Sequence, residues 1–101
     1  MTKQLMWDAF PEIQISIKQA QELMEQDDLI IAEAIYRDLL DREQNCPPAL
    51  YGLAGLADKI NDQALRKELL QAAIEQLENV DDQNKKSLKA IWIVELAAIV
   101  N

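Results

Sequence analysis

The sequence nearly repeats itself at an interval of 34 residues. A polar turn, Asp27-Asp28, returns as Asn61-Asp62, and apolar residues before and after it recur at the same spacing. The recurring apolar pairs are Ala20 and Ala54, Ile35 and Leu69, Tyr36 and Leu70, Leu39 and Ala73, and Leu40 and Ile74. A helical repeat of this length is typical of helical hairpins that stack side by side, and such stacks usually bind other proteins.

The composition favours one helical domain that binds neither nucleic acid nor membrane. Half of the 101 residues are apolar, and the chain has two Gly and three Pro. The net charge of −8 would repel nucleic-acid phosphates and anionic lipid, although simple solubility is its plainer interpretation. The single cysteine suits a reducing compartment, the first ten residues do not resemble a signal peptide, and no apolar run approaches the ~20 residues that span a bilayer. We therefore expect a cytoplasmic location.

Apolar residues at helical spacing predict five helices after a short lead-in over residues 1–10. The breaks that separate them lie at residues 10–11, 27–28, 45–48, 61–62 and 80–82. Because the loops are short, neighbouring helices should be antiparallel. Small residues should let the helices approach closely, and larger residues one turn further along should fill the space between hairpins. The small residues are Ala20, Ala32 and Ala54, with Gly52 and Gly55 inside the third helix, and the larger ones are Leu23, Tyr36 and Leu70.

On these residues the chain resembles the tetratricopeptide repeat, a 34-residue helix–turn–helix unit. Two copies match, over residues 13–46 and 47–80, and residues 81–101 would begin a third, with Leu88 aligned to Ala54 and Ile91 to Ala57. The resemblance implies an all-α domain over residues 1–101, in which antiparallel hairpins stack as a short right-handed superhelix. Two positions depart from the family pattern: Arg66 replaces a small residue, and Gln44 replaces a proline.

In this family the first helix of each unit lines a concave groove, so the resemblance implies a protein or peptide bound there. The predicted groove contacts are Ile17, Gln21, Met24, Tyr51, Asp58, Lys85, Lys89 and Trp92, with Gln14, Pro48 and Gly55 on the same helix faces. The two lysines could meet a ligand carboxylate or simply be solvated, and Trp92 could line the groove or the core. Binding of a chaperone's C-terminal tail is not expected, because Lys86 alone has a suitable side chain at the positions that grip such tails.

The last predicted helix has almost no polar face. The segment AIWIVELAAIV, residues 90–100, contains one charged residue, Glu95, whereas the terminal helix of a stack normally needs a polar outer face. Three candidates could cover this apolar helix: the lead-in with its apolar side chains, a second copy of the chain, or a partner. The lead-in side chains are Leu5, Met6, Trp7 and Phe10, and the candidate oligomer interface is Ile93, Val94, Ala97 and Val100.

The residues needed for most catalytic and metal sites are missing from the sequence. The chain has no histidine and one cysteine, which excludes a tetrahedral zinc set and the usual catalytic triads. Cys46 could be a reactive thiol at a helix start or, far more commonly, a packed side chain. We therefore predict a non-enzymatic adaptor, or a small bacterial-type chaperone or assembly factor, without a cofactor or metal. The alternative is a structural homo-oligomer joined through the last helix.

Overall fold

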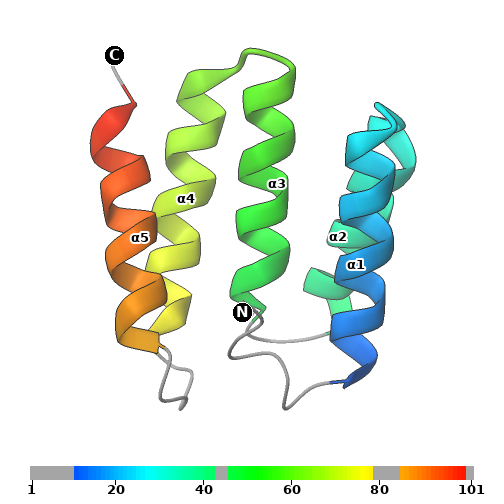
Figure 1. The fold of residues 1–101 in the computed structure, drawn as a ribbon, viewed down its shortest axis with the longest axis horizontal. Helices are drawn as coiled ribbons and strands as arrows, with labels where there is room; N and C mark the ends of the chain where they lie inside the picture. The colour runs from blue at the N-terminus through cyan, green and yellow to red at the C-terminus, as the bar shows by residue number, and fades with distance from the viewer. Residues whose placement is uncertain (1–10, 43–45, 79–84, 100–101) are drawn as a thin grey trace.

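Five α-helices, and no strand, make up the part of the chain that the computed structural model describes, residues 11–42, 46–78 and 85–99 (Figure 1). The helices are α1 (Pro11–Glu25), α2 (Leu29–Arg42), α3 (Pro47–Lys59), α4 (Gln63–Leu77) and α5 (Lys85–Ala98). The all-α class and the predicted turns at residues 27–28 and 61–62 are confirmed. The lead-in over residues 1–10, the break at residues 80–82 and Val100 lie outside the described residues.

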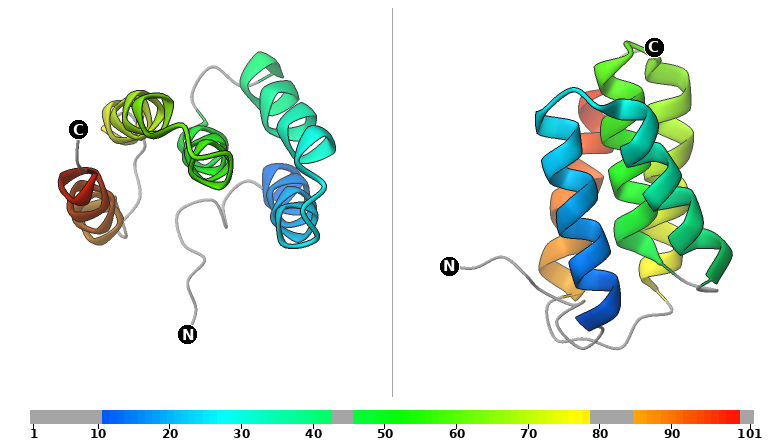
Figure 2. Two further views of the ribbon diagram at one scale, coloured as in Figure 1. Left: turned by 90° about the horizontal axis from the view of Figure 1, so that it is seen from above. Right: turned by 90° about the vertical axis from the view of Figure 1, so that its right-hand side faces the viewer.

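Successive helices run in opposite directions and form hairpins, as predicted (Figure 1). α1 packs on α2, α3 packs on α4, and the two hairpins meet where α3 contacts both α1 and α2. α5 then packs on α4. Seen from above, α1, α3 and α5 lie in one layer and α2 and α4 in the other (Figure 2). We call the layer of α1, α3 and α5 the inner layer.

The turns that close the two hairpins have the same backbone geometry. Asp27 and Asn61 both adopt the left-handed conformation, with φ of 66° and 64°. The residue after each turn donates its backbone N–H to a carbonyl five residues earlier, at 2.8 Å in both hairpins. This pair of features is the Schellman arrangement, which satisfies carbonyl groups left over at a helix C-terminus. The repeat seen in the letters of the sequence is therefore a repeat of structure.

The second turn also begins its next helix with a side-chain cap. The carboxylate of Asp62 accepts the backbone N–H of Leu65 at 3.1 Å, which satisfies one of the unpaired donors of the first turn of α4. At the other end of this hairpin, the Cys46 N–H donates to Gln76 Oε1 at 2.9 Å and ties the start of α3 to α4. The Cys46 side chain is buried, as the packed interpretation predicted.

The hydrophobic core consists of two clusters that share α3. The first lies among α1, α2 and α3, and its buried residues are Ile13, Ile17, Ala20, Ala32, Tyr36, Leu39, Cys46, Ala49 and Leu53. The second lies among α3, α4 and α5, and its buried residues, apart from Ile99 just beyond α5, are Leu50, Ala54, Leu70, Ala73, Leu77 and Trp92. Leu40 and Leu69 pack against both clusters. The predicted close-approach residues Ala20, Ala32 and Ala54 are buried, as expected.

The two glycines of α3 differ in what surrounds them. A Cβ atom added to Gly52 would lie 2.2 Å from Cζ of Tyr36, a buried α2 side chain, so Gly52 is required for the two hairpins to meet. A Cβ added to Gly55 would lie 3.8 Å from Cε of Met24, an ordinary van der Waals distance. The prediction that both glycines serve close packing is correct for Gly52 and wrong for Gly55.

We expect opposite effects from alanine at these two positions. Gly52→Ala should lower the free energy of unfolding by about 2 kcal/mol, because the added methyl overlaps the Tyr36 ring. Gly55→Ala should raise it by about 0.5–1 kcal/mol, because alanine favours a helix and meets no close atom there. Urea unfolding followed by circular dichroism measures both. A loss of stability in Gly55→Ala would contradict this account of the inner layer.

Candidate interaction surfaces

Tyr51 of α3 and Trp92 of α5 stack on each other rather than standing open on the inner layer. Their ring centroids are 4.7 Å apart, and the ring planes are nearly parallel at 8°. Trp92 is 2% exposed, so of the two predicted alternatives, groove or core, the structure places it in the core. The stacked rings therefore join α3 directly to α5.

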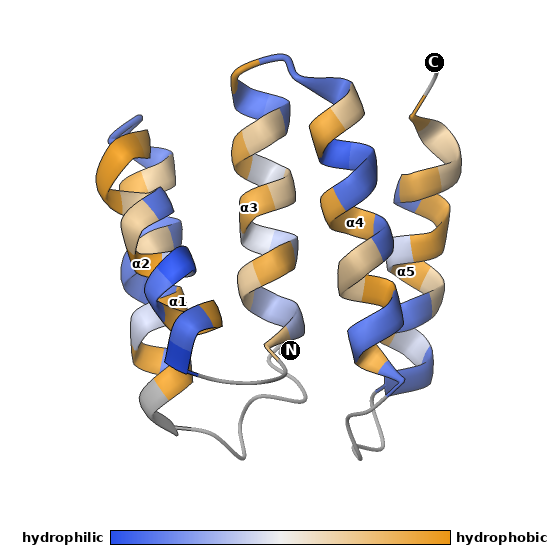
Figure 3. Ribbon diagram, turned by 180° about the vertical axis from the view of Figure 1, so that it is seen from behind, coloured by the Kyte–Doolittle hydropathy of each residue, from blue (hydrophilic) through white to orange (hydrophobic). Residues whose placement is uncertain are grey.

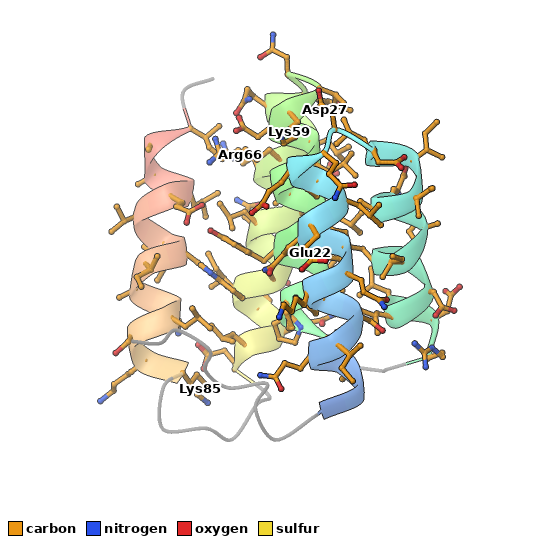
Figure 4. All side chains as sticks on the ribbon, turned by 45° about the vertical axis from the view of Figure 1, so that its right-hand side comes forward. Glu22, Asp27, Lys59, Arg66 and Lys85 are labelled. Carbon is orange, nitrogen blue, oxygen red and sulfur yellow. The ribbon has the colours of Figure 1, made fainter. Side chains whose placement is uncertain are left out.

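The lone charge of the apolar segment, Glu95, completes a polar network beside this stack. The Tyr51 hydroxyl donates to Glu95 Oε2 at 2.5 Å, and Arg66 Nη2 lies 3.8 Å from Glu95 Oε1. Arg66 Nη1 lies 3.5 Å from Asp58 Oδ1, so this α4 side chain, which Figure 4 labels, links α3 to α5. Sequence reasoning singled out Glu95 as a lone charge and Arg66 as a departure from the family pattern, but did not pair them.

The network holds the Tyr51 phenol in its protonated form. Burial raises the pKa of Tyr51 far above its ordinary value of 10.0, and the hydrogen bond to Glu95 raises the pKa further. A phenol with such a pKa does not give up its proton near neutral pH. The arrangement therefore positions α5 against α3.

The two predicted groove lysines fasten α5 to the end of α4. Lys89 pairs with the Glu78 carboxylate, and Lys85 Nζ donates to the Glu78 backbone carbonyl at 3.2 Å. The hydrogen bond from Lys89 lowers the pKa of Glu78. Lysine near a helix C-terminus is favourable because the unpaired carbonyls carry partial negative charge. Both lysines thus have a partner within the chain. This favours the interpretation that they offset local acidic charge over the interpretation that they bind the carboxylate of a ligand.

The remaining groove candidates lie in different environments. Ile17 is 4% exposed and packs in the first core cluster, so its side chain offers no surface to a partner in this structure. Gln21 is exposed, and the half-buried Met24 lies against Gly55. Of the predicted groove residues, the structure therefore brings together Met24 and Gly55, whereas Tyr51 and Asp58, on the same helix as Gly55, have partners on α5 and α4. Gln14 is half-buried and Pro48 is buried.

Three large apolar residues are exposed on α5, more than on any other described helix. Ile91, Ile93 and Val94 are 54%, 45% and 68% exposed. The alanines beside them are exposed as well, and Figure 3 shows α5 as mostly hydrophobic beyond its first turn. We define the α5 outer face as Ala90, Ile91, Ile93, Val94, Ala97 and Ala98, which includes three of the four predicted oligomer-interface residues.

The predicted equivalence of Ile91 with Ala57 does not extend to burial. Ala57 is fully buried, because α3 has helices packed on both of its sides. Ile91 is 54% exposed, because α5 is the last helix of the described stack and α4 is its main neighbour. Leu88, in contrast, packs against the second core cluster as the alignment with Ala54 predicted.

Two further observations bear on function. Among the described residues, no group of three Cys, Asp or Glu side chains could hold a metal ion, and no helix is long and apolar enough to cross a membrane. Comparison of the chain with protein-family models, with curated proteins and with solved structures finds no match. The function is therefore inferred from the surfaces themselves.

The Tyr51 environment predicts a loss of stability at alkaline pH. The folded chain keeps the phenol proton above pH 10, where the unfolded chain releases it, so the free energy of unfolding should fall as pH rises beyond 10. Tyr36 adds to the effect, because burial raises its pKa to about 12. Tyr51→Phe should cost about 1 kcal/mol at pH 7 through the lost hydrogen bond, and should flatten the alkaline slope.

Urea unfolding at pH 7, 10 and 11 measures this slope. Tyr36→Phe is the comparison variant: it should also flatten the alkaline slope, because it removes a phenol whose pKa burial raises to about 12, but it leaves the Glu95 hydrogen bond in place. An alkaline slope that both single variants leave unchanged would contradict the assignment of the pH effect to these tyrosines.

Proposed function

We propose that the chain is a non-enzymatic protein-interaction module and that the α5 outer face is its principal binding surface. The observation that carries the proposal is the exposure of Ile91, Ile93 and Val94 on one helix. The exposed side of a helix is normally polar, and this one is apolar. Exposed apolar patches of this kind mark sites where proteins associate.

The constrained polar residues support binding rather than catalysis. Tyr51, Glu95 and Arg66 satisfy one another in a network that joins three helices. The raised pKa of Tyr51 suits a fixed hydrogen-bond donor and does not suit a general base. These groups therefore support a rigid scaffold that presents a surface.

Two Schellman turns at a 34-residue interval support the tetratricopeptide-like interpretation of the repeat. On that interpretation the module would serve as an adaptor or as a small chaperone or assembly factor. Its acidic surface disfavours nucleic acid as a partner, and its single cysteine fits a reducing cytoplasm.

A second candidate surface is the inner layer, where the resemblance places a peptide groove. The specific observation in its favour is that the half-buried Met24 of α1 lies against Gly55 of α3, about one helical turn along α3 from the half-buried Tyr51. Methionine and tyrosine are common at binding surfaces. Its weakness is that Tyr51 and Asp58 already have partners within the chain.

Site-specific photo-crosslinking tests the α5 outer face. A photoreactive residue at Val94 should form covalent protein adducts in the cells that produce the chain, because Val94 is 68% exposed at the centre of the face. The matched control is Ile30, an 83% exposed apolar residue on α2. Adducts at Val94 and few at Ile30 support the proposal. Equal labelling at both positions, or none, would refute it.

The inner layer can be tested separately with a blocking substitution. Gly55→Gln adds a side chain where the structure has room for a Cβ, so the fold should remain intact. If the inner layer binds a peptide, a photoreactive residue at the exposed Gln21 should form adducts that Gly55→Gln reduces at least tenfold. Adducts that are insensitive to Gly55→Gln would rule out this surface.

A further inference from the structure

We propose that α5 occupies a helix-binding surface on α3 and α4, and that a helix of a partner protein binds there by displacing it. The partner helix carries an aromatic residue and, three residues later, a carboxylate. The inference goes beyond the proposed function, because the surface lies beneath α5 and not on the α5 outer face. Two sets of observations lead to it: how the surface holds α5, and how weakly α5 is attached.

The surface beneath α5 combines apolar residues with two polar groups. We define the α5-binding surface as Tyr51 and Ala54 of α3 with Arg66, Leu70, Ala73 and Leu77 of α4. The four apolar residues belong to the second core cluster, which also contains Trp92 of α5. The two polar residues contact α5 directly. Apolar surfaces that accept one side of an amphipathic helix are a common mode of peptide recognition.

The docked α5 shows which side chains this surface recognises. Trp92 stacks on Tyr51 with ring centroids 4.7 Å apart, and it is 2% exposed. Glu95, about one helical turn further along, accepts the Tyr51 hydroxyl at 2.5 Å and lies 3.8 Å from Arg66. Tyrosine and arginine are enriched among the residues that dominate binding energy at interfaces. A helix with an aromatic residue followed three residues later by a carboxylate therefore matches the surface.

α5 has the fewest buried residues of the described helices. Trp92 is its single buried residue, whereas α3 has eight and each of the other described helices has at least three. The polar contacts on its inner side are partly open to water, since the side chains of Arg66 and Glu95 are 23% and 32% exposed. Segments with few buried apolar contacts open at a lower free energy than the rest of a fold.

The sequence of α5 is also a poor one for a helix. The β-branched residues Ile91, Ile93 and Val94 lie in its middle, and such residues lower helix propensity. Lys85 and Lys86 occupy its first turn, where the helix dipole disfavours positive charge and no acidic residue offsets it. The covalent link gives α5 a local concentration of about mM order. A partner helix with the same two anchors and a better helix-forming sequence can therefore compete with it.

The other four helices keep a core of their own when α5 leaves. The first core cluster contains no residue of α5. α3 and α4 remain joined through the apolar residues of the second cluster and through the hydrogen bond from Cys46 to Gln76. The α5-binding surface therefore has a folded support whether or not α5 is docked.

Hydrogen exchange of the wild-type chain tests whether α5 opens by itself. Amides of residues 91–95, at the centre of α5, should exchange at least about tenfold faster than those of residues 53–57, at the centre of α3. Glu95→Gln removes the charge that faces Arg66, so it should speed exchange in α5 further and leave α1 unchanged. Equal protection of α5 and α3 would overturn the proposal, because α5 would then open only when the whole chain unfolds.

A labelled synthetic peptide with the sequence of residues 85–99 probes the surface in the full-length chain. Trp92→Ala in the chain removes the main anchor of the resident α5, so this variant should bind the peptide at least about tenfold more tightly than the wild-type chain does. Fluorescence anisotropy measures the affinity. Val94→Ala is the matched control, because it shortens a 68% exposed side chain of the same helix and should not raise the affinity.

The milder variant Glu95→Gln keeps this test decisive if Trp92→Ala disturbs the fold. It should raise peptide affinity in the same direction by a smaller factor, with the circular-dichroism spectrum at pH 7 unchanged. A folded variant that has lost an α5 anchor and binds the peptide no better than the wild-type chain does would overturn the proposal.

Substitutions within the peptide test the recognised pair of side chains. A peptide with Trp92→Ala should lose at least about tenfold in affinity, and one with Glu95→Gln should lose several-fold, because these side chains contact Tyr51 and Arg66. A peptide with Val94→Ala should bind as the unchanged peptide does. Equal losses in all three would indicate non-specific apolar adsorption and overturn the proposal.

Light scattering distinguishes a partner's helix from α5 of a second copy. Two copies gain no contact by exchanging identical helices, and each already holds its own at high local concentration. The wild-type mass should therefore stay at 11.5 kDa. A doubled mass that Trp92→Ala abolishes and Val94→Ala preserves would indicate exchange of α5 between copies and overturn the partner helix.

Discussion

The contact between Tyr36 and Gly52 is the constraint on which the arrangement of the two hairpins depends. The Tyr36 ring comes from the second helix of the first hairpin and occupies the space that a Cβ of Gly52 would need. This close approach brings α3 against both α1 and α2, and it allows α3 to serve both core clusters. The inner layer, and the position of α5 at its far end, follow from how closely α3 sits against the first hairpin.

The parts of this fold that were predictable from sequence are those set by near neighbours in the chain. A helix ends where a few consecutive residues can no longer continue it, so the pairs Asp27-Asp28 and Asn61-Asp62 mark the hairpin turns directly. Buried alanines such as Ala20 and Ala54 are likewise identified by their recurrence, because each hairpin repeats the same crossing. These features can be predicted from the sequence because the interactions that produce them are local or repeated.

The surroundings of Trp92 and Glu95 were not predictable in the same way. Their environments depend on how α5 is rotated about its own axis, and a helix that is apolar on nearly every side gives no pattern from which to read that rotation. Tyr51 and Arg66, which lie on α3 and α4, decide it by binding Glu95. A lone charge in an apolar helix was a visible signal that some polar partner exists. The identity of that partner is a tertiary property.

The same network decides which apolar residues α5 presents to the outside. Because Glu95 is held against Tyr51 and Arg66, and Trp92 stacks on Tyr51, one side of α5 is fixed inward. Ile93 and Val94, which point away from the side of Trp92 and Glu95, are then outward, although they are no more polar than the residues that are buried. A polar contact on the inner side of the helix thus defines the apolar surface on its outer side. Removing that contact would allow α5 to rotate about its axis. The set of exposed apolar residues would then no longer be fixed, and the packing of α5 on α4 would weaken.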